Sequence, residues 1–175
     1  MTVYESETDD VTGLTEIVDR AVSGETMRHP PHARLTWHAE ALPSGLGVRQ
    51  VYGFIYDSAG RILVQEHEGR FNLPGGKPEP GESLDAALHR ESLEESQVEI
   101  DNLVYLGFQL VVSAGEAPYA QVRYRARLVR VLPLAADPAT DQVYARRFVL
   151  PDELEKLLGW TTGAEQIAAS ERAGH

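Results

Sequence analysis

The sequence contains no cysteine and has few methionines and tryptophans, two of each. The absence of cysteine excludes a disulfide framework, a thiolate zinc site and a cysteine nucleophile. A long hydrophobic run is also missing: the longest apolar stretch, residues 103–112, is about ten residues long and is interrupted by Gly107 and Gln109, whereas a membrane span needs about 20. The start is polar and acidic, unlike a secretory signal. We therefore expect a cytoplasmic protein with no membrane partner.

The chain has 175 residues, of which 42% are hydrophobic and 25% charged. This length and composition predict one sizeable core and a soluble globular protein, since domains have roughly 100 to 200 residues. We assign residues 33–175 to that domain. Residues 1–32 are interpreted as an acidic N-terminal extension with one amphipathic helix, whose apolar positions are Leu14, Ile17, Val18, Ala21 and Val22.

Acidic residues outnumber basic ones, because 16 Lys+Arg stand against 27 Asp+Glu and the net charge is −11. This balance argues against a nucleic-acid polymer as partner. The charge is concentrated in two blocks: residues 1–26 hold seven acids and one base, and residues 66–101 hold ten acids and three bases. A phosphate-bearing substrate would be repelled unless a bound cation reversed the local sign.

The pattern of apolar residues predicts a mixture of strands and helices without strict alternation. Such an order favours an α/β (α+β) fold in which a mixed sheet lies between helices. The strands are expected at residues 34–41, 48–57, 61–67, 102–112, 119–132 and 142–149, with a short apolar piece at 71–73, and the helices at 83–97, 152–158 and 163–172.

The predicted helix at 83–97 carries carboxylates within its apolar stripe, which would run from Leu84 to Val98. Glu91, Glu94 and Glu95 fall on the same side as Leu88, although burying unpaired carboxylates is costly and like charges at this spacing repel. Oxygen donors clustered in this way suit Mg²⁺ or Mn²⁺ better than zinc. The alternative is a solvated charged face, with the helix packing instead through Ala86, His89 and Leu93.

The segment before this helix is a loop with the sequence Gly75-Gly76-Lys77-Pro78-Glu79-Pro80-Gly81-Glu82. Its glycines allow unusual backbone dihedral angles and close backbone approach, and the loop leads directly into the N-terminus of the helix. Taken together, the loop and the helix resemble the Nudix box, G-x5-E-x7-R-E-U-x-E-E-x-G-U, where U is apolar. The matching residues are Gly76, Glu82, Arg90, Glu91, Glu94, Glu95 and Val98.

Two positions depart from the pattern. Ser92 stands at an apolar position, and Gln97 replaces the glycine that closes the helix. The glutamates are untouched, but the C-terminus of the helix is put in doubt. The resemblance also implies an α/β/α sandwich with a mixed β-sheet, similar to the family in the order of its elements from about residue 48 to 158.

Members of the Nudix family hydrolyse nucleoside diphosphates linked to another group, using a divalent metal. The resemblance therefore implies a Mg²⁺-dependent pyrophosphohydrolase, with Mn²⁺ as an alternative cofactor and a nucleotide-derived small molecule as substrate. It assigns as metal ligands Glu91, Glu94, Glu95 and the carbonyl of Gly75. It gives catalytic roles to Glu82, Arg90, Glu94 and Glu95, with Arg90 pairing with Glu82. Substrate contacts are expected at Gly76 and Lys77. A nucleotide-sensing module without turnover and an acidic protein interface are the competing hypotheses, and a homodimer is left open.

Two further features lie outside the box. Arg123, Arg125 and Arg127 alternate along a predicted strand and share one face. Arg123 and Arg125 are candidates for binding substrate phosphate, although a solvent face that protects an edge strand is the interpretation we favour. Glu116 could reach the metal from another loop, but an exposed loop glutamate is commoner.

Overall fold

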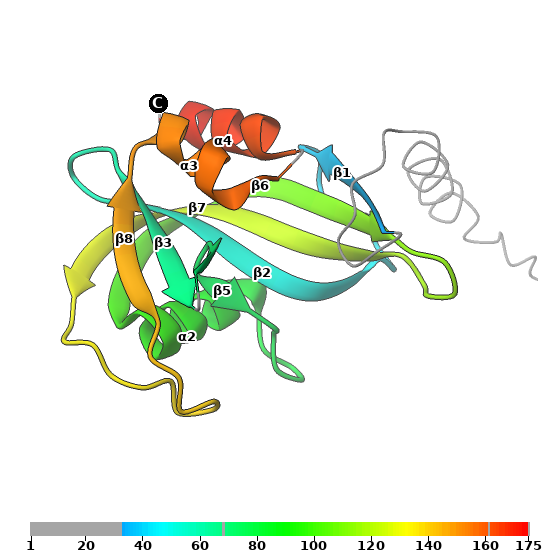
Figure 1. The fold of residues 1–175 in the computed structure, drawn as a ribbon. Coiled ribbons are helices and arrows are strands. Elements are labelled where there is room, and N and C mark those ends of the chain that lie inside the picture. The colour runs from blue at the N-terminus through cyan, green and yellow to red at the C-terminus, as the bar shows by residue number, and fades with distance from the viewer. Residues whose placement is uncertain (1–32, 68, 161, 175) are drawn as a thin grey trace, which may run out of the picture.

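The computed structural model describes residues 33–67, 69–160 and 162–174. Eight strands of this part of the chain form one mixed sheet, and three helices cover its two faces (Figure 1). The predicted mixed sheet between helices is thereby confirmed. The predicted N-terminal helix falls in residues 1–32, outside the described residues. None of the described helices is long and apolar enough to cross a membrane.

The elements follow the predicted order with shifted ends. The strands are β1 (Arg34–His38), β2 (Gly47–Tyr56), β3 (Ile62–His67), β4 (Arg70–Asn72), β5 (Gly75–Gly76), β6 (Val98–Val112), β7 (Tyr119–Val131) and β8 (Ala145–Val149), and the helices are α2 (Leu84–Ser96), α3 (Pro151–Leu158) and α4 (Gly163–Arg172). The largest differences from prediction are at β6, which begins four residues earlier, at β8, which begins three residues later, and at β1, which ends three residues earlier.

The sheet runs in the order β1-β6-β7-β2-β3-β4, and only β2 and β7 pair in parallel. Strand β7 is therefore internal, and the interpretation of its arginine face as a guarded edge is wrong. Strand β3 pairs with β2 only at Tyr56 and Ile62, after which β5 becomes the neighbour of β2. This split of the sheet separates the ends of β3 and β4 from β2.

Helix α2 packs on one face of the sheet, and α3 and α4 pack on the other (Figure 1). The N-cap of α2 is Ser83, whose hydroxyl accepts a hydrogen bond from the Ala86 N–H. Ala87 and Leu88 are fully buried against the sheet, whereas Leu93 is 45% exposed. Packing through Ala86, His89 and Leu93 is therefore excluded.

Helix α2 ends without the glycine of the family pattern. Gln97 takes the left-handed conformation at φ 46°, and its N–H binds the carbonyl of Leu93. Its side-chain Nε2 donates to the carbonyl of Glu94 at 2.6 Å. A non-glycine residue in this conformation costs about 1–2 kcal/mol, and these two hydrogen bonds at the helix end offset part of it. The glycine-to-glutamine change thus leaves the helix end in place.

The packing of α2 predicts unequal effects at its two central leucines. Leu88→Ala should lower the free energy of unfolding by about 2–5 kcal/mol, because it leaves a cavity in the core. Leu93→Ala should cost less than about 1 kcal/mol, because nearly half of that side chain is already in solvent. Urea unfolding of both variants tests this difference, and equal losses would contradict the orientation of α2.

Candidate active site

Arg90 is the centre of the polar contacts on α2. Its Nε and Nη2 donate to the two carboxylate oxygens of Glu82, both at 3.0 Å, and Nη2 also donates to the carbonyl of Lys77 at 3.2 Å. Nη1 donates to Glu91 at 3.0 Å and to Glu94 at 3.1 Å. The pairing of Arg90 with Glu82 agrees with the expectation from the family pattern. These bonds raise the pKa of Arg90 and lower that of Glu82.

The carboxylate of Glu91 lies over a glycine. A Cβ atom at Gly76 would come within 2.5 Å of the Glu91 carboxyl carbon, so a side chain at this position would have to displace the Glu91 carboxylate. Gly75 is also required: it has φ 143°, and a Cβ there would lie 2.1 Å from the carbonyl oxygen of Val51. The two glycines thus let the loop pass between β2 and the glutamates of α2.

Glu95 is the most perturbed of the three glutamates. Burial raises its pKa to about 7, opposed by hydrogen bonds from Gln65 and from the backbone of Gly75 and reinforced by the charges of Glu91 and Asp137. Gln65 donates to Glu95 at 2.8 Å. Burial also raises the pKa of Glu91, against the hydrogen bond from Arg90. These two half-buried carboxylates therefore share a region in which a cation would be favoured.

A cavity opens beside Glu95 where the sheet splits. One wall belongs to β2 and β5 and the other to β3 and β4, and the lining residues are Gln50, Tyr52, Gln65, His67, Arg70, Asn72, Gly75, Gly76, Glu95 and Tyr144. The cavity therefore brings Glu95, the box glycine Gly76 and its neighbour Gly75 next to aromatic and amide side chains from other elements. Its position identifies it as the candidate substrate site.

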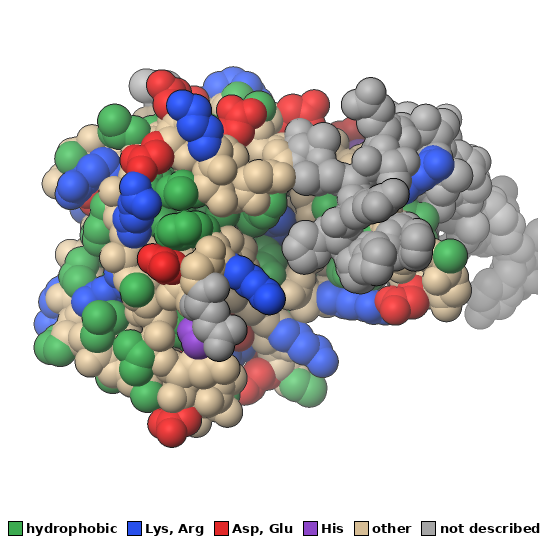
Figure 2. All heavy atoms as spheres, in the orientation of Figure 1, with side chains coloured by type: hydrophobic (Ala, Val, Ile, Leu, Met, Phe, Trp, Pro, Cys, Tyr) green, Lys and Arg blue, Asp and Glu red, His purple; other side chains and the backbone are tan. Residues whose placement is uncertain are grey.

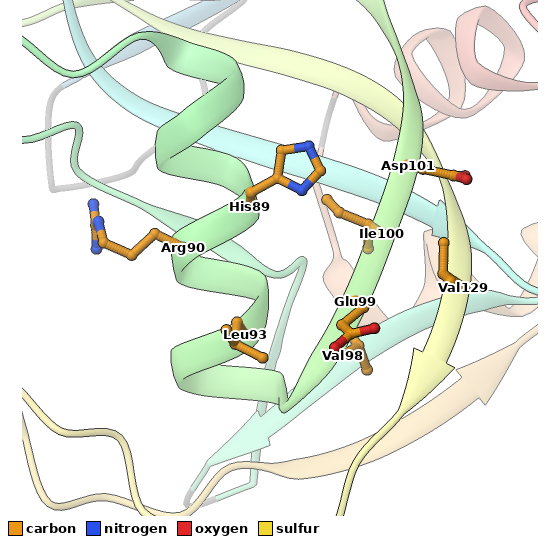
Figure 3. Close-up of a pocket in the computed structure, with 8 residues that line it drawn as sticks. All are labelled: His89, Arg90, Leu93, Val98, Glu99, Ile100, Asp101 and Val129. Atoms are coloured by element: carbon orange, nitrogen blue, oxygen red, sulfur yellow. The ribbon is translucent and has the colours of Figure 1, made fainter.

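A second hollow lies between α2 and the strands β6 and β7, and it is more apolar. Its lining residues are His89, Arg90, Leu93, Val98, Glu99, Ile100, Asp101 and Val129. Figure 3 shows Arg90 pointing away from β6, on the other side of α2. None of the three glutamates of the metal prediction lines this hollow, so we do not assign the chemistry to it.

The carboxylate oxygens of Glu91, Glu94 and Glu95 suit a hard divalent cation, but they do not converge on a single point. Over the described residues, no three Asp, Glu or His side chains converge closely enough to hold a metal ion. The reason is that Arg90 draws Glu91 and Glu94 toward the loop, while Gln65 holds Glu95. The helix nevertheless provides three carboxylates within two turns, and carboxylate oxygens are ligands that Mg²⁺ and Mn²⁺ prefer.

Several predicted residues lie elsewhere. Arg123 is 1% exposed, and Arg125 donates to the carbonyl of Ser170 on α4. Neither lines the cavity, and their assignment as phosphate ligands is not supported, because both guanidiniums pack under α4. Glu116 is exposed and pairs with Arg49 at 2.8 Å, on the β6–β7 connection far from α2 (Figure 1). Lys77 is exposed and contributes its carbonyl to the Arg90 cluster.

Sequence reasoning missed Gln65 and Asp137. Gln65 is a polar residue that ends the apolar run Ile62–Val64, which was an available signal. Asp137 is 5% exposed in the β7–β8 connection, where it accepts hydrogen bonds from the Ala139 N–H and the Thr140 hydroxyl. Nothing in the local sequence indicated that this aspartate would lie near the glutamates.

On one face of the molecule, charged side chains do not form a patch of one sign. On the face shown in Figure 2, basic and acidic side chains are interspersed. Exposed pairs such as Arg127 with Asp101 and Arg130 with Glu99 account for part of this balance. The attraction of an anionic substrate therefore depends on the site itself.

Comparison with known proteins agrees with this geometry. The sequence model of the NUDIX domain matches residues 48–169, and the chain belongs to this family. A putative 8-oxo-dGTP diphosphatase, YtkD, from Bacillus subtilis (strain 168) is 45% identical over 49 residues, which are 27% of this chain and 31% of that protein. The chain thus matches about a third of the length of that relative.

Solved structures show the same fold. A mutant of the Bacillus subtilis pyrophosphohydrolase BsRppH has a TM-score of 0.67 at 22% identity, covering 81% of this chain and 92% of the other. A NUDIX hydrolase from Nitrosomonas europaea has a TM-score of 0.59 at 20% identity, covering 73% and 90%. At these identities the likeness establishes the fold.

The close contact at Gly76 predicts a loss of divalent metal binding on substitution. Gly76→Ala should displace the Glu91 carboxylate and weaken Mn²⁺ binding by about tenfold or more, measured by isothermal titration. Gly47→Ala is the matched control, because a Cβ there meets nothing within 4 Å. Unchanged affinity in a folded Gly76→Ala protein would contradict the placement of Glu91 in a metal site.

The raised pKa of Glu95 predicts a pH dependence of stability. Its carboxyl titrates near 4.5 when unfolded and near 7 when folded, so its stabilising contribution is full below about pH 4.5 and is lost as the pH rises through 7. Thermal unfolding with a chelator present should therefore show a smaller decrease in Tm from about pH 5 to pH 8 in Glu95→Gln than in the wild type. The exposed Glu79→Gln is the control, and it should keep the wild-type slope.

Proposed function

We propose that this protein hydrolyses a diphosphate linkage in a nucleotide-derived small molecule with the help of Mg²⁺ or Mn²⁺. The observation that carries the proposal is the half-buried Glu95 carboxylate, which lies at a cavity beside Gly75 and Gly76 and on the same helix as Glu91 and Glu94. The family membership and the activities for which the relatives are named, a diphosphatase and a pyrophosphohydrolase, support it.

The residues proposed for the site have different roles, which follow from their positions. Glu91, Glu94 and Glu95 would hold the metal, and a carbonyl from Gly75 would add a further oxygen. When bound, the metal would neutralise diphosphate oxygens and lower the pKa of the attacking water. Arg90 does not line the cavity wall near Glu95 and is bonded to Glu82, so its role is to position the loop against α2.

The general base is one of two glutamates, Glu94 and Glu95. Glu95 lines the cavity, whereas Glu94 is bonded to Arg90 outside the cavity lining. This difference favours Glu95 as the group that accepts the proton of the attacking water. Tyr52 on β2 and Tyr144 just before β8 also line the cavity and offer aromatic faces on which a nucleobase would stack.

Assays of phosphate and nucleoside monophosphate release test this proposal. With Mg²⁺ or Mn²⁺, the wild type should hydrolyse at least one member of a panel of nucleoside triphosphates, nucleotide sugars and ADP-ribose. Glu94→Gln and Glu95→Gln should each lose about a hundredfold or more in kcat. Glu99→Gln is the control, because that exposed glutamate pairs with Arg130 on β6 and β7.

Two outcomes would count against the proposal. Full activity in either Glu94→Gln or Glu95→Gln would remove that residue from the site. Binding of nucleotides without any hydrolysis across the panel would favour the nucleotide-sensing module.

A further inference from the structure

Arg123 is a buried cation that the proposed hydrolysis does not use. Its guanidinium carbon lies 4.7 Å from the ring centre of Tyr52 and 5.2 Å from that of Trp160. Its Nε donates to Gln166 Oε1 on α4 at 2.8 Å. Among the described residues no carboxylate pairs with it, and burial lowers its pKa to about 10. A buried charge with only amide, carbonyl and aromatic neighbours calls for an explanation.

Arg123 fixes the direction of the hydrogen bonds that link four glutamine side chains. A guanidinium only donates, so each neighbouring amide must turn its oxygen toward it. Gln166 therefore turns its Nε2 outward, to Gln109 Oε1 at 3.1 Å, and Gln109 in turn donates to Gln121 Oε1 at 2.9 Å. Arg123 Nη2 also contacts Gln121 Oε1 directly, at 3.4 Å. Gln121 then donates from its Nε2 to Gln50 Oε1.

This chain of bonds ends at the wall of the cavity, because Gln50 lines it. Its amide oxygen is taken by Gln121, and in the described part of the chain no hydrogen bond uses its Nε2. Gln50 therefore offers an N–H donor to whatever occupies the cavity. Arg123 prevents the amide from turning over, since that would place two N–H groups against each other between Gln50 and Gln121.

We propose that Gln50 determines base specificity by donating a hydrogen bond from Nε2 to a carbonyl oxygen of the substrate's nucleobase, and that Arg123 fixes this direction. The proposal rests on the proposed function of the same cavity. A base is the expected partner because Gln50 lies with Tyr52 and Asn72 on uncharged parts of the lining, whereas Glu95 and the two glycines mark the diphosphate end. The favoured substrates are nucleotides whose base carries a carbonyl group where its competitor carries an amino group.

Two pairs of nucleotides present this difference, together with a change of the adjacent ring nitrogen from N–H donor to acceptor: inosine triphosphate with ATP, and UTP with CTP. In each pair one base carries a carbonyl oxygen at the position where the other carries an amino group. The wild type should prefer the carbonyl member by about fivefold in kcat/KM, the value of one neutral hydrogen bond. Gln50→Glu, which only accepts, should reverse the preference, and Gln50→Leu should abolish it. Gln142→Glu, an exposed change of the same charge outside the lining that still offers an acceptor to the Tyr144 hydroxyl, should keep it.

A substitution behind the cavity wall gives the sharper test. Gln121→Glu places an acceptor-only group between Arg123 and Gln50. One oxygen can still receive Arg123 and Gln109, and the other forces Gln50 to turn its Nε2 inward and its oxygen toward the cavity. The preference should then reverse as in Gln50→Glu, although no lining residue has changed. The new carboxylate also pairs with the buried guanidinium, so the protein should remain folded, as thermal unfolding will check.

The outcomes separate this inference from the proposed function. Hydrolysis without a base preference, or an unchanged preference in folded Gln121→Glu, overturns the role of Gln50 and leaves the hydrolase standing. An equal loss for all four nucleotides in Gln50→Leu also overturns it, because Gln50 then contacts ribose or phosphate. If no member of the full panel is hydrolysed, the proposed function fails, and equilibrium titration of these four nucleotides still decides whether the carbonyl members bind more tightly.

Discussion

The guanidinium of Arg90 holds together the part of the molecule that the proposed chemistry needs. It binds both oxygens of Glu82 and the carbonyl of Lys77, which fixes the loop before α2, and it contacts Glu91 and Glu94 on the helix itself. Without this cation, carboxylates three and four residues apart would repel one another beside a buried surface. The geometry of the loop and the positions of Glu91 and Glu94 therefore depend on Arg90, and a metal would have to take these two carboxylates over from its Nη1.

A split in the sheet supplies the second half of the site. Strand β3 leaves β2 after a single residue pair, and the two-residue strand β5 takes its place. The gap lets Glu95 reach a cavity whose opposite wall comes from β2. Gln50 on that wall is linked through Gln121 and Gln109 to Gln166 on α4. The orientation of an amide in the cavity therefore depends on residues that lie on the face of the sheet covered by α4, opposite α2.

The sequence predicted those features that depend on the spacing of residues close together in the chain. Helical periodicity placed three glutamates on one stripe, and the family pattern implied the pairing of Arg90 with Glu82 that the structure contains. It did not predict the burial of Arg123, because alternation along a strand shows which residues share a face but not whether that strand is internal. The chain of glutamines was equally hidden, since it joins four elements between residues 50 and 166. The amphipathic helix expected within residues 1–32, and the division of the chain at residue 33, stay predictions.

The central claim is that the glutamates of α2 form a divalent metal site braced by Arg90. Anomalous X-ray scattering from crystals soaked in Mn²⁺ tests it most directly, because the metal is located without reference to activity. The account predicts a peak within coordination distance of carboxylate oxygens of Glu91, Glu94 and Glu95, with Arg90 still bonded to Glu82. No peak at these glutamates in Mn²⁺-saturated crystals, or a peak only at other carboxylates of the chain, would contradict it.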